Sequence, residues 1–282
     1  MMIHKRTNLG AILKTVLIYI ELIVVALIVI YPLIWIVGSS FGSSKGLANA
    51  SAIPEQATLQ NYKELFQQTN YPLWYMNTLK VAAANMFFGV LLSTLGAYAF
   101  SRFTFKGKRA SLLTILILQM FPAFLTAIAV YMLFLNFGLL DSLTGLVVVG
   151  VAAQLPYNIW LLKGYLDNIS TSFDEAGLID GASRTQIFVR IILPLASPMI
   201  TFVAVLQFAA PWMDFILPRL LISSEEKKTV AIGLYSMISD QTRNEFTLFA
   251  AGSVLVAIPI AVLYILLQKY LINGLTAGGD KG

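Results

Sequence analysis

The sequence predicts an all-α membrane protein with six transmembrane helices. Of its 282 residues, 58% are hydrophobic and only 12% are charged, whereas about a quarter of the residues in a typical soluble domain are charged. The mean hydropathy of +0.78 reflects recurrent apolar stretches. Each is about 20 residues long, the length that a helix needs to cross a bilayer.

The composition excludes several classes of function. The chain has no cysteine, and its single histidine, His4, lies near the N-terminus. It contains no GxxxxGK[ST] phosphate-binding loop and no HExxH pattern. We therefore expect no catalytic residue, no metal site and no ATPase activity on this chain. The net charge of +5 is better explained by membrane topology than by nucleic acid, because the few charges lie in loops between apolar stretches.

The predicted order is a basic tail at 1–15, a six-helix transmembrane domain at 16–272 and a tail at 273–282. The first apolar run is too long for the core of a signal peptide, so we interpret it as a retained anchor. The six spans are predicted at residues 16–37, 77–100, 112–135, 144–162, 199–221 and 249–271.

Local features justify the spans and the loops between them. Residues 38–76 read as a long polar loop with an aromatic end suited to a membrane interface. The second span carries small residues, among them Gly89 and Gly96, that permit close helix contacts. Pro122 predicts a kink in the third span, and residues 222–247 read as a polar loop.

The distribution of basic residues predicts the orientation. Six spans place both termini on one side, and that side carries twelve of the nineteen Lys and Arg residues. The short loop at 101–111 holds four basic residues, whereas the turn at 136–143 holds none. The positive-inside rule therefore places both termini and the loop at 163–198 in the cytoplasm.

The loop at 163–198 carries its own helix signals. Ser172 with Glu175, and Ser183 with Gln186, have the spacing of capping boxes. Two short helices are therefore expected within this loop.

A glycine and a proline are expected to end these two helices. Gly181 suits the left-handed turn that ends the first helix. Pro194 is expected to end the second, because the residue before a proline is pushed out of the helical region. Small and acidic residues share the first helix and its end, namely Glu175, Ala176, Gly177, Asp180 and Gly181.

Polar residues inside the spans are candidates for a translocation path. Asp214 lies about two-thirds of the way across the fifth span, where a charge costs about 3 kcal/mol. It should therefore face protein or a water-filled path, and a structural hydrogen bond explains it as well as transport does. Gln119, Asn158 and Gln207 leave the same two interpretations open. Trp212 is either a core residue or a stacking platform for sugar rings.

The loop resembles the EAA loop of importer-type ABC-transporter permeases. Glu175-Ala176-Gly177, three residues, Gly181, nine residues and Ile191-Ile192-Leu193-Pro194 match E-A-A, three residues, G, nine residues and I-x-L-P, with Gly177 in place of an alanine. The Asn-Gly-Leu-Thr-Ala-Gly ending and the segment Pro211-Trp212-Met213-Asp214-Phe215 look like the smaller permease of maltose/maltodextrin-type carbohydrate importers.

This resemblance implies the type I ABC importer permease fold in a prokaryotic inner or plasma membrane. It also implies a second permease, an extracytoplasmic sugar-binding protein, and two copies of a cytoplasmic ATPase that binds ATP and Mg. In that family the EAA loop docks on the ATPase. The resemblance extends that role to Ser172, Glu175, Ala176, Gly177, Asp180, Gly181, Ile191, Leu193 and Pro194. It leaves the particular sugar open.

Two other functions fit an apolar chain of this kind. An ATP-independent secondary transporter or channel usually shows internal repeats or several buried charges. This sequence has no evident repeat and one deep carboxylate, Asp214. A membrane scaffold would recruit a partner without moving solute.

Overall fold

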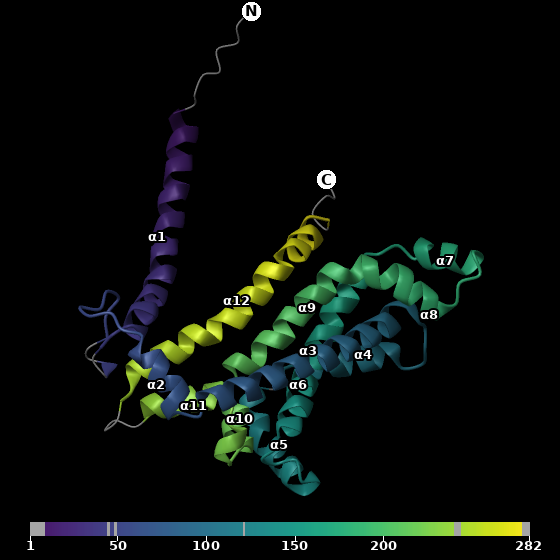
Figure 1. The fold of residues 1–282 in the computed structure, drawn as a ribbon. Coiled ribbons are helices and arrows are strands. Elements are labelled where there is room, and N and C mark those ends of the chain that lie inside the picture. Colours follow the sequence, from purple (N-terminus) through teal and green to yellow (C-terminus); the bar gives the residue numbers. More distant parts are fainter. Residues whose placement is uncertain (1–8, 44–45, 48–49, 121, 240–243, 278–282) are drawn as a thin grey trace, which may run out of the picture. The chain divides into compact units, whose positions relative to one another are not determined.

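The computed structural model describes residues 9–43, 46–47, 50–120, 122–239 and 244–277 (Figure 1). In this part of the chain the named elements are all helices, which confirms the all-α prediction. Five continuous helices are long and apolar enough to cross a membrane: Leu13–Ser40, Tyr71–Arg102, Leu143–Leu166, Arg184–Met213 and Phe246–Lys269. The predicted tails at 1–15 and 273–282 lie partly outside the described residues.

The chain forms two compact units, and the first comprises residues 1–69 and 236–254. It contains α1 (Leu9–Ser40), α2 (Gln60–Gln68) and parts of α11 (Val230–Ser239) and α12 (Phe246–Ala277). The Asn61 amide donates to the carbonyls of Ser40 at 2.9 Å and Gly42 at 2.7 Å. These bonds hold α2 against the end of α1, so the predicted polar loop at 38–76 contains an ordered helix.

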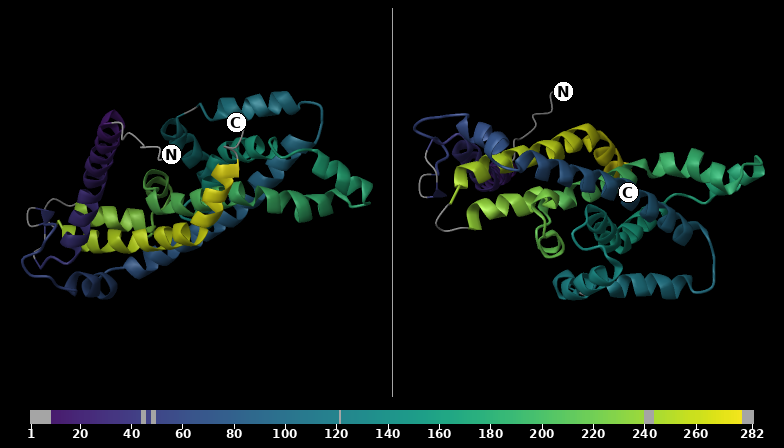
Figure 2. Two further views of the ribbon diagram at one scale, coloured as in Figure 1. Left: turned by 90° about the horizontal axis from the view of Figure 1, so that it is seen from above. Right: turned by 60° about the horizontal axis from the view of Figure 1, so that its bottom comes forward.

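The second unit, residues 70–235 and 255–282, has three long helices at its centre. These are α3 (Tyr71–Arg102), α6 (Leu143–Leu166) and α9 (Leu193–Met213), which pack against one another (Figure 2). A Cβ on Gly89 of α3 would lie 2.3 Å from the Gln207 amide nitrogen of α9. A Cβ on Gly96 would lie 3.0 Å from Ile159 of α6. The predicted use of small residues for close helix contacts is thus confirmed.

The predicted third span is divided into two helices. α4 (Lys108–Leu118) ends before Gln119, and α5 (Ala123–Phe137) starts after Pro122, whose ψ of 124° is extended. The N–H groups of Gln119 and Met120 bond three residues back, in the tight pattern that ends a helix. The kink predicted at Pro122 is thus a break between two helices. Five continuous helices in the described residues are long enough to span a membrane, so the count of six spans stays a prediction.

The fifth span and the following loop also differ from the prediction. The helix ends at Met213, Asp214 is extended, and the short helix α10 (Ile216–Leu221) follows. The predicted polar loop at 222–247 contains a 3-10 turn, η3 (Glu225–Lys227), and the whole of α11. Val230 and Ile232 of α11 are buried, so this helix is stabilised by tertiary packing.

A network of hydrogen bonds ties the turn before α6 to the segment after α10. The Asp141 carboxylate accepts bonds from the N–H groups of Ser223 at 3.0 Å and Ser224 at 2.9 Å. It also accepts from the Ser224 hydroxyl and from Lys227 Nζ at 3.0 Å. These bonds, led by the Ser224 N–H, hold the pKa of Asp141 well below its usual range.

Candidate functional site

The loop between α6 and α9 folds as two short helices joined by a glycine turn. α7 (Ser172–Ile179) is followed by Gly181 with φ +78°, as predicted, and then by α8 (Arg184–Ile187). The Ser183 hydroxyl accepts from the Gln186 N–H at 3.3 Å, and the Gln186 side chain accepts from the Ser183 N–H at 2.7 Å. The second predicted capping box is therefore confirmed, and it fixes the start of α8.

The first predicted capping box does not form. Thr171, one residue earlier, already has helical backbone angles (φ −67°, ψ −16°), and its carbonyl accepts from the Glu175 N–H at 3.0 Å. Ser172 thus lies inside the first turn, and its hydroxyl pairs with that of Ser170 at 2.8 Å. A serine inside the helix cannot cap it, because capping requires a non-helical residue at the boundary.

Pro194 does not end the second helix, contrary to the prediction. A π-helical turn, η2 (Phe188–Ile192), follows α8 and runs directly into α9. The Leu193 N–H bonds to the Phe188 carbonyl five residues back, and Leu193 itself is helical. A proline ring conflicts with the carbonyl four residues earlier in a regular α-helix. The wider π turn directly before Pro194 relieves that conflict, so the chain stays helical through the proline.

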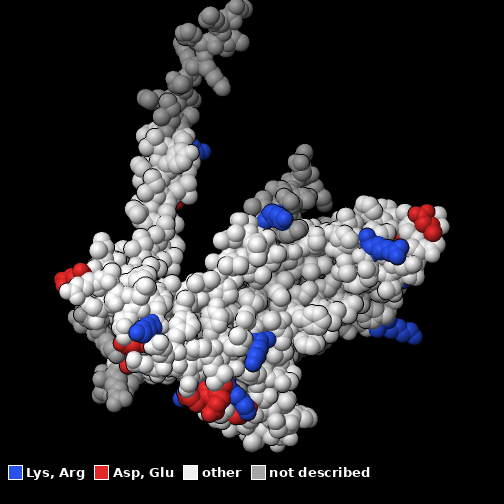
Figure 3. Space-filling view, viewed as in Figure 1, with Lys and Arg blue, Asp and Glu red and all other residues white. Residues whose placement is uncertain are grey.

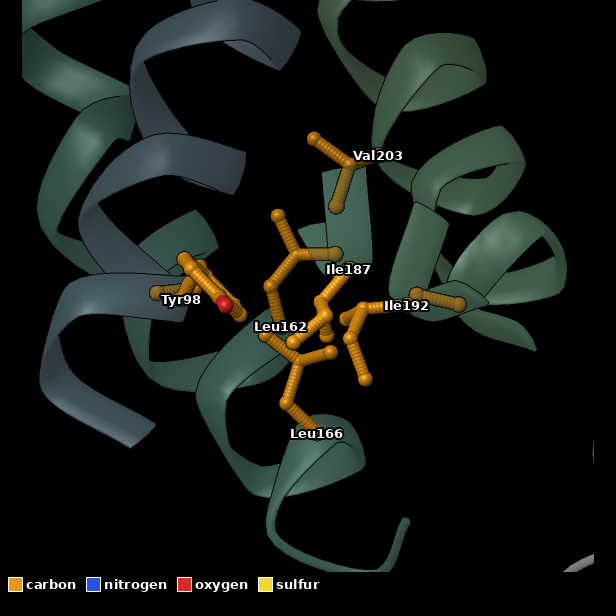
Figure 4. Close-up of a cluster of buried hydrophobic side chains, with 8 residues drawn as sticks. Tyr98, Leu162, Leu166, Ile187, Ile192 and Val203 are labelled. Carbon is orange, nitrogen blue, oxygen red and sulfur yellow. The ribbon is translucent and has the colours of Figure 1, made fainter. Parts of the chain in front are cut away.

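One side of this loop is built into the helix bundle. Side chains from α3, α6, α8, η2 and α9 converge in one apolar cluster (Figure 4). It includes Tyr98, Leu162, Leu166, Ile187, Ile192 and Val203. Gly177 of α7 is buried on the same side. A Cβ there would lie 2.9 Å from Ile187 Cγ1 and 3.3 Å from Ile191 Cδ1. Its small size therefore serves the packing of α7 on α8 and η2.

The other side of α7 is open. Glu175, Ala176 and Asp180 are exposed. Ile179 is 86% exposed, and the large apolar side chains of Phe173 and Leu178 are exposed as well. Acidic side chains mark the α7 end of the molecule (red, Figure 3). An exposed apolar surface with carboxylates beside it is suited to binding another protein.

The four path candidates differ in exposure and surroundings. Gln119 is exposed at the end of α4, whereas Asn158 of α6 is fully buried. Trp212 is 3% exposed and packs on the rings of Tyr75 and Phe208, at 5.0 and 6.0 Å between centroids. This placement favours the core interpretation of Trp212, because no face of its ring is open to a sugar.

Asp214 lies at the break after α9 and stabilises the start of the next helix, α10. Its carboxylate accepts hydrogen bonds from the N–H groups of Leu217 and Ile216, the start of α10. It also lines a cavity of about 50 Å³, together with the polar residues Asn85 and Thr229. The sequence did not point to these two residues, because Asn85 lies in an apolar stretch, Thr229 lies in a predicted loop, and neither belongs to a recognisable motif. Buried oxygens of both have no hydrogen-bond partner among the described residues.

The family follows from a sequence match over two-thirds of the chain. The pattern of the binding-protein-dependent transport system inner membrane component matches residues 87–276. The chain therefore belongs to this family of ABC importer permeases. No metal-binding cluster of acidic, histidine or cysteine side chains occurs in the described ranges.

Individual relatives cover nearly the whole chain. The galactooligosaccharides transport system permease protein GanQ of Bacillus subtilis (strain 168) is 42% identical over 94% of both chains. The maltodextrin transport system permease protein MdxG of the same organism is 40% identical over 94% of this chain and 95% of its own. The maltose/maltodextrin transport system permease protein MalG of Escherichia coli (strain K12) is 35% identical over 90% of this chain and 91% of its own.

Solved structures agree with this assignment. A chain of a bacterial ABC transporter involved in the import of alginate superposes with a TM-score of 0.78 at 26% identity. The match covers 96% of this chain and 99% of the other. A second structure, of a bacterial alginate ABC transporter in complex with an alginate pentasaccharide-bound periplasmic protein, gives a TM-score of 0.70 at 17% identity and supports the fold alone. It covers 92% of this chain and 94% of the other.

Proposed function

We propose that this chain is a permease subunit of an ATP-driven carbohydrate importer and forms half of its translocation path. The observation that carries the proposal is the loop at 172–193. It presents an exposed acidic and apolar helix, α7, and the α8 and η2 segments that follow it are anchored in the helix bundle. A loop anchored in this way can transmit the movement of a bound soluble partner to the membrane-spanning helices. The family indicates a transport function, and the relatives named for sugar transport indicate that the substrate is a carbohydrate.

The substrate we propose is an oligosaccharide of the maltodextrin type. Relatives named for galactooligosaccharides and for maltodextrin have nearly equal identity, 42% and 40%. Galactooligosaccharide is therefore the second substrate to assay. A binding protein outside the membrane would deliver either sugar, and a second permease would complete the path.

The partner of α7 is proposed to be a cytoplasmic ATPase, two copies of which bind ATP and Mg. Glu175, Ala176 and Asp180 are exposed, which supports this proposal. In it, the two carboxylates pair with basic groups of the ATPase, and the small side chain of Ala176 lets the ATPase backbone approach closely. This assignment requires the loop and both termini to be cytoplasmic. The excess of basic residues on that side supports the orientation.

Reconstitution with the co-purifying partners tests this function. We would compare wild type with Glu175→Lys for ATPase retention, ATP hydrolysis and sugar uptake. Glu55→Lys makes the same charge change at another exposed site and is the control. We expect Glu175→Lys to lose ATPase retention or coupled uptake and the control to keep both. If no ATPase co-purifies and sugar flux runs without ATP, the chain is an ATP-independent transporter or channel instead.

A further inference from the structure

We propose that Arg102, the last residue of α3, is a positioning residue that links α7 mechanically to α3. The inference rests on the proposed function, because it names the group through which the loop would transmit ATPase movement. Arg102 attracts attention in the sequence only as one of four basic residues at 101–111. The structure separates it from the others.

The Arg102 guanidinium is buried against the loop. Its Nε lies 3.0 Å from the Asp174 carboxylate, and the two side chains are only 5% and 9% exposed. Its Nη2 donates to the Ile169 carbonyl at 2.8 Å. One side chain of α3 therefore holds both the turn before α7 and the first turn of α7.

Neighbouring residues at the end of α3 contact the rest of the loop. Tyr98 packs on Phe188 of η2 with ring centroids 4.6 Å apart. The Arg184 guanidinium of α8 lies 5.5 Å from the centre of the Phe103 ring. The end of α3 thus meets η2 and α8 by ring contacts, whereas its charged contact is with α7.

The ion pair is significant because α3 and α7 are distant in sequence. α7 is joined by the chain to α6 and, through α8 and η2, to α9. Its link to α3 has to pass through space, and α3 packs along both α6 and α9. The Arg102 guanidinium is buried and held by its hydrogen bond to the Ile169 carbonyl, and Asp174 contacts it as an ion pair outside hydrogen-bond geometry. A displacement of the first turn of α7 would therefore move the end of α3 through this buried ion pair. We infer that removing this link lowers the sugar taken up per ATP hydrolysed while the ATPase stays bound.

The experiment measures that ratio in proteoliposomes that contain the whole transporter. Arg102→Gln removes the charge, Arg102→Lys keeps it, and Arg109→Gln removes an exposed charge from the same segment as a control. We expect uptake per ATP to fall at least about threefold in Arg102→Gln. It should recover at least in part in Arg102→Lys and stay at the wild-type value in Arg109→Gln.

A second variant covers the case in which Arg102→Gln does not fold, since it leaves Asp174 buried without its partner. The double variant Arg102→Met with Asp174→Leu removes both charges and keeps the volume filled. We expect it to retain the ATPase and still lose uptake per ATP. A folded double variant with the wild-type ratio would overturn the inference, as would equal losses in Arg102→Gln and Arg109→Gln.

Hydrogen exchange separates this inference from the proposed function. Amides of 172–179 in the isolated chain should exchange faster in Arg102→Gln than in Arg109→Gln, whatever the chain transports. If wild-type uptake needs no ATP but this difference is found, the proposed function fails and the positioning of α7 by Arg102 stands. If exchange at 172–179 is the same in both variants, the positioning role is refuted.

Discussion

Replacing Gly177 by alanine is expected to destabilise the segment at 172–193, although alanine is the better helix former. Gly177 lies inside α7, where the change to alanine contributes about 1 kcal/mol of helix propensity. The new methyl group would lie 2.9 Å from Ile187 Cγ1, closer than an ordinary van der Waals contact of 3.4–4 Å. Ile187 is fully buried and cannot turn away freely.

The balance of these two effects sets the magnitude. Overpacking by one methyl group in a dense core costs about 1–3 kcal/mol. Subtracting the gain in helix propensity leaves a net loss of about 1 kcal/mol. In an Ile187→Ala background the obstructing side chain is gone, and the added methyl group fills part of the cavity. There Gly177→Ala should stabilise the segment by about 1 kcal/mol.

Hydrogen exchange of amides 172–193 measures this double-mutant cycle, because it reports the local opening free energy. The expected result is a change of sign between the two backgrounds. An equal effect of Gly177→Ala in both would refute the packing argument, since it would show that the methyl group and Ile187 do not meet. A stabilising effect in the wild-type background would show that α7 moves away at little cost.

Three further results are expected. Gly181→Ala should cost about 1 kcal/mol in the same exchange assay, because φ at this position is +78°, and Gly181→Asn should cost less. Asp141→Asn should lower the melting temperature of the detergent-solubilised protein at pH 7. Since the pKa of Asp141 is lowered in the fold, its contribution is complete above the unfolded pKa of about 4. The gap between wild type and Asp141→Asn should therefore be constant from about pH 8 to 5 and shrink below about pH 4. Asp214→Ala should destabilise α10 by about 1 kcal/mol through its lost hydrogen bonds, whereas Asp214→Asn should keep uptake within a few-fold. A large loss of uptake in a folded Asp214→Asn protein would make its charge part of the path.

The features that the sequence predicted correctly have local causes. The long apolar helices follow from composition, and the turn at Gly181 and the box at Ser183 follow from the preferences of single residues. The break at Pro122 did not follow, because a proline in an apolar run fits a kink as well as an end. α11 was missed since its short apolar stretch follows the charged residues at 225–228 and is stabilised by burial.

The pairing of Arg102 with Asp174 could not be predicted either. The two residues are far apart in sequence, and Asp174 stands next to Glu175 with the same charge. Only the helical register separates the two carboxylates, because successive residues of a helix point about 100° apart. With Gly177 three positions later, Asp174 lies on the buried side of α7, while Glu175 lies on the exposed side.

Because of this register, the two adjacent carboxylates should have different roles, one in binding the ATPase and the other in transmitting its movement. Glu175 is accessible to a partner and should affect how tightly the ATPase binds, whereas Asp174 is inaccessible and should affect how movement of the bound ATPase reaches the spans. Neutral variants of the two should therefore differ in kind. Glu175→Gln should change ATPase retention at a constant uptake per ATP, and Asp174→Asn should change uptake per ATP at constant retention. If both variants changed the same quantity, α7 would act as a single patch, and the division between docking and transmission would be wrong.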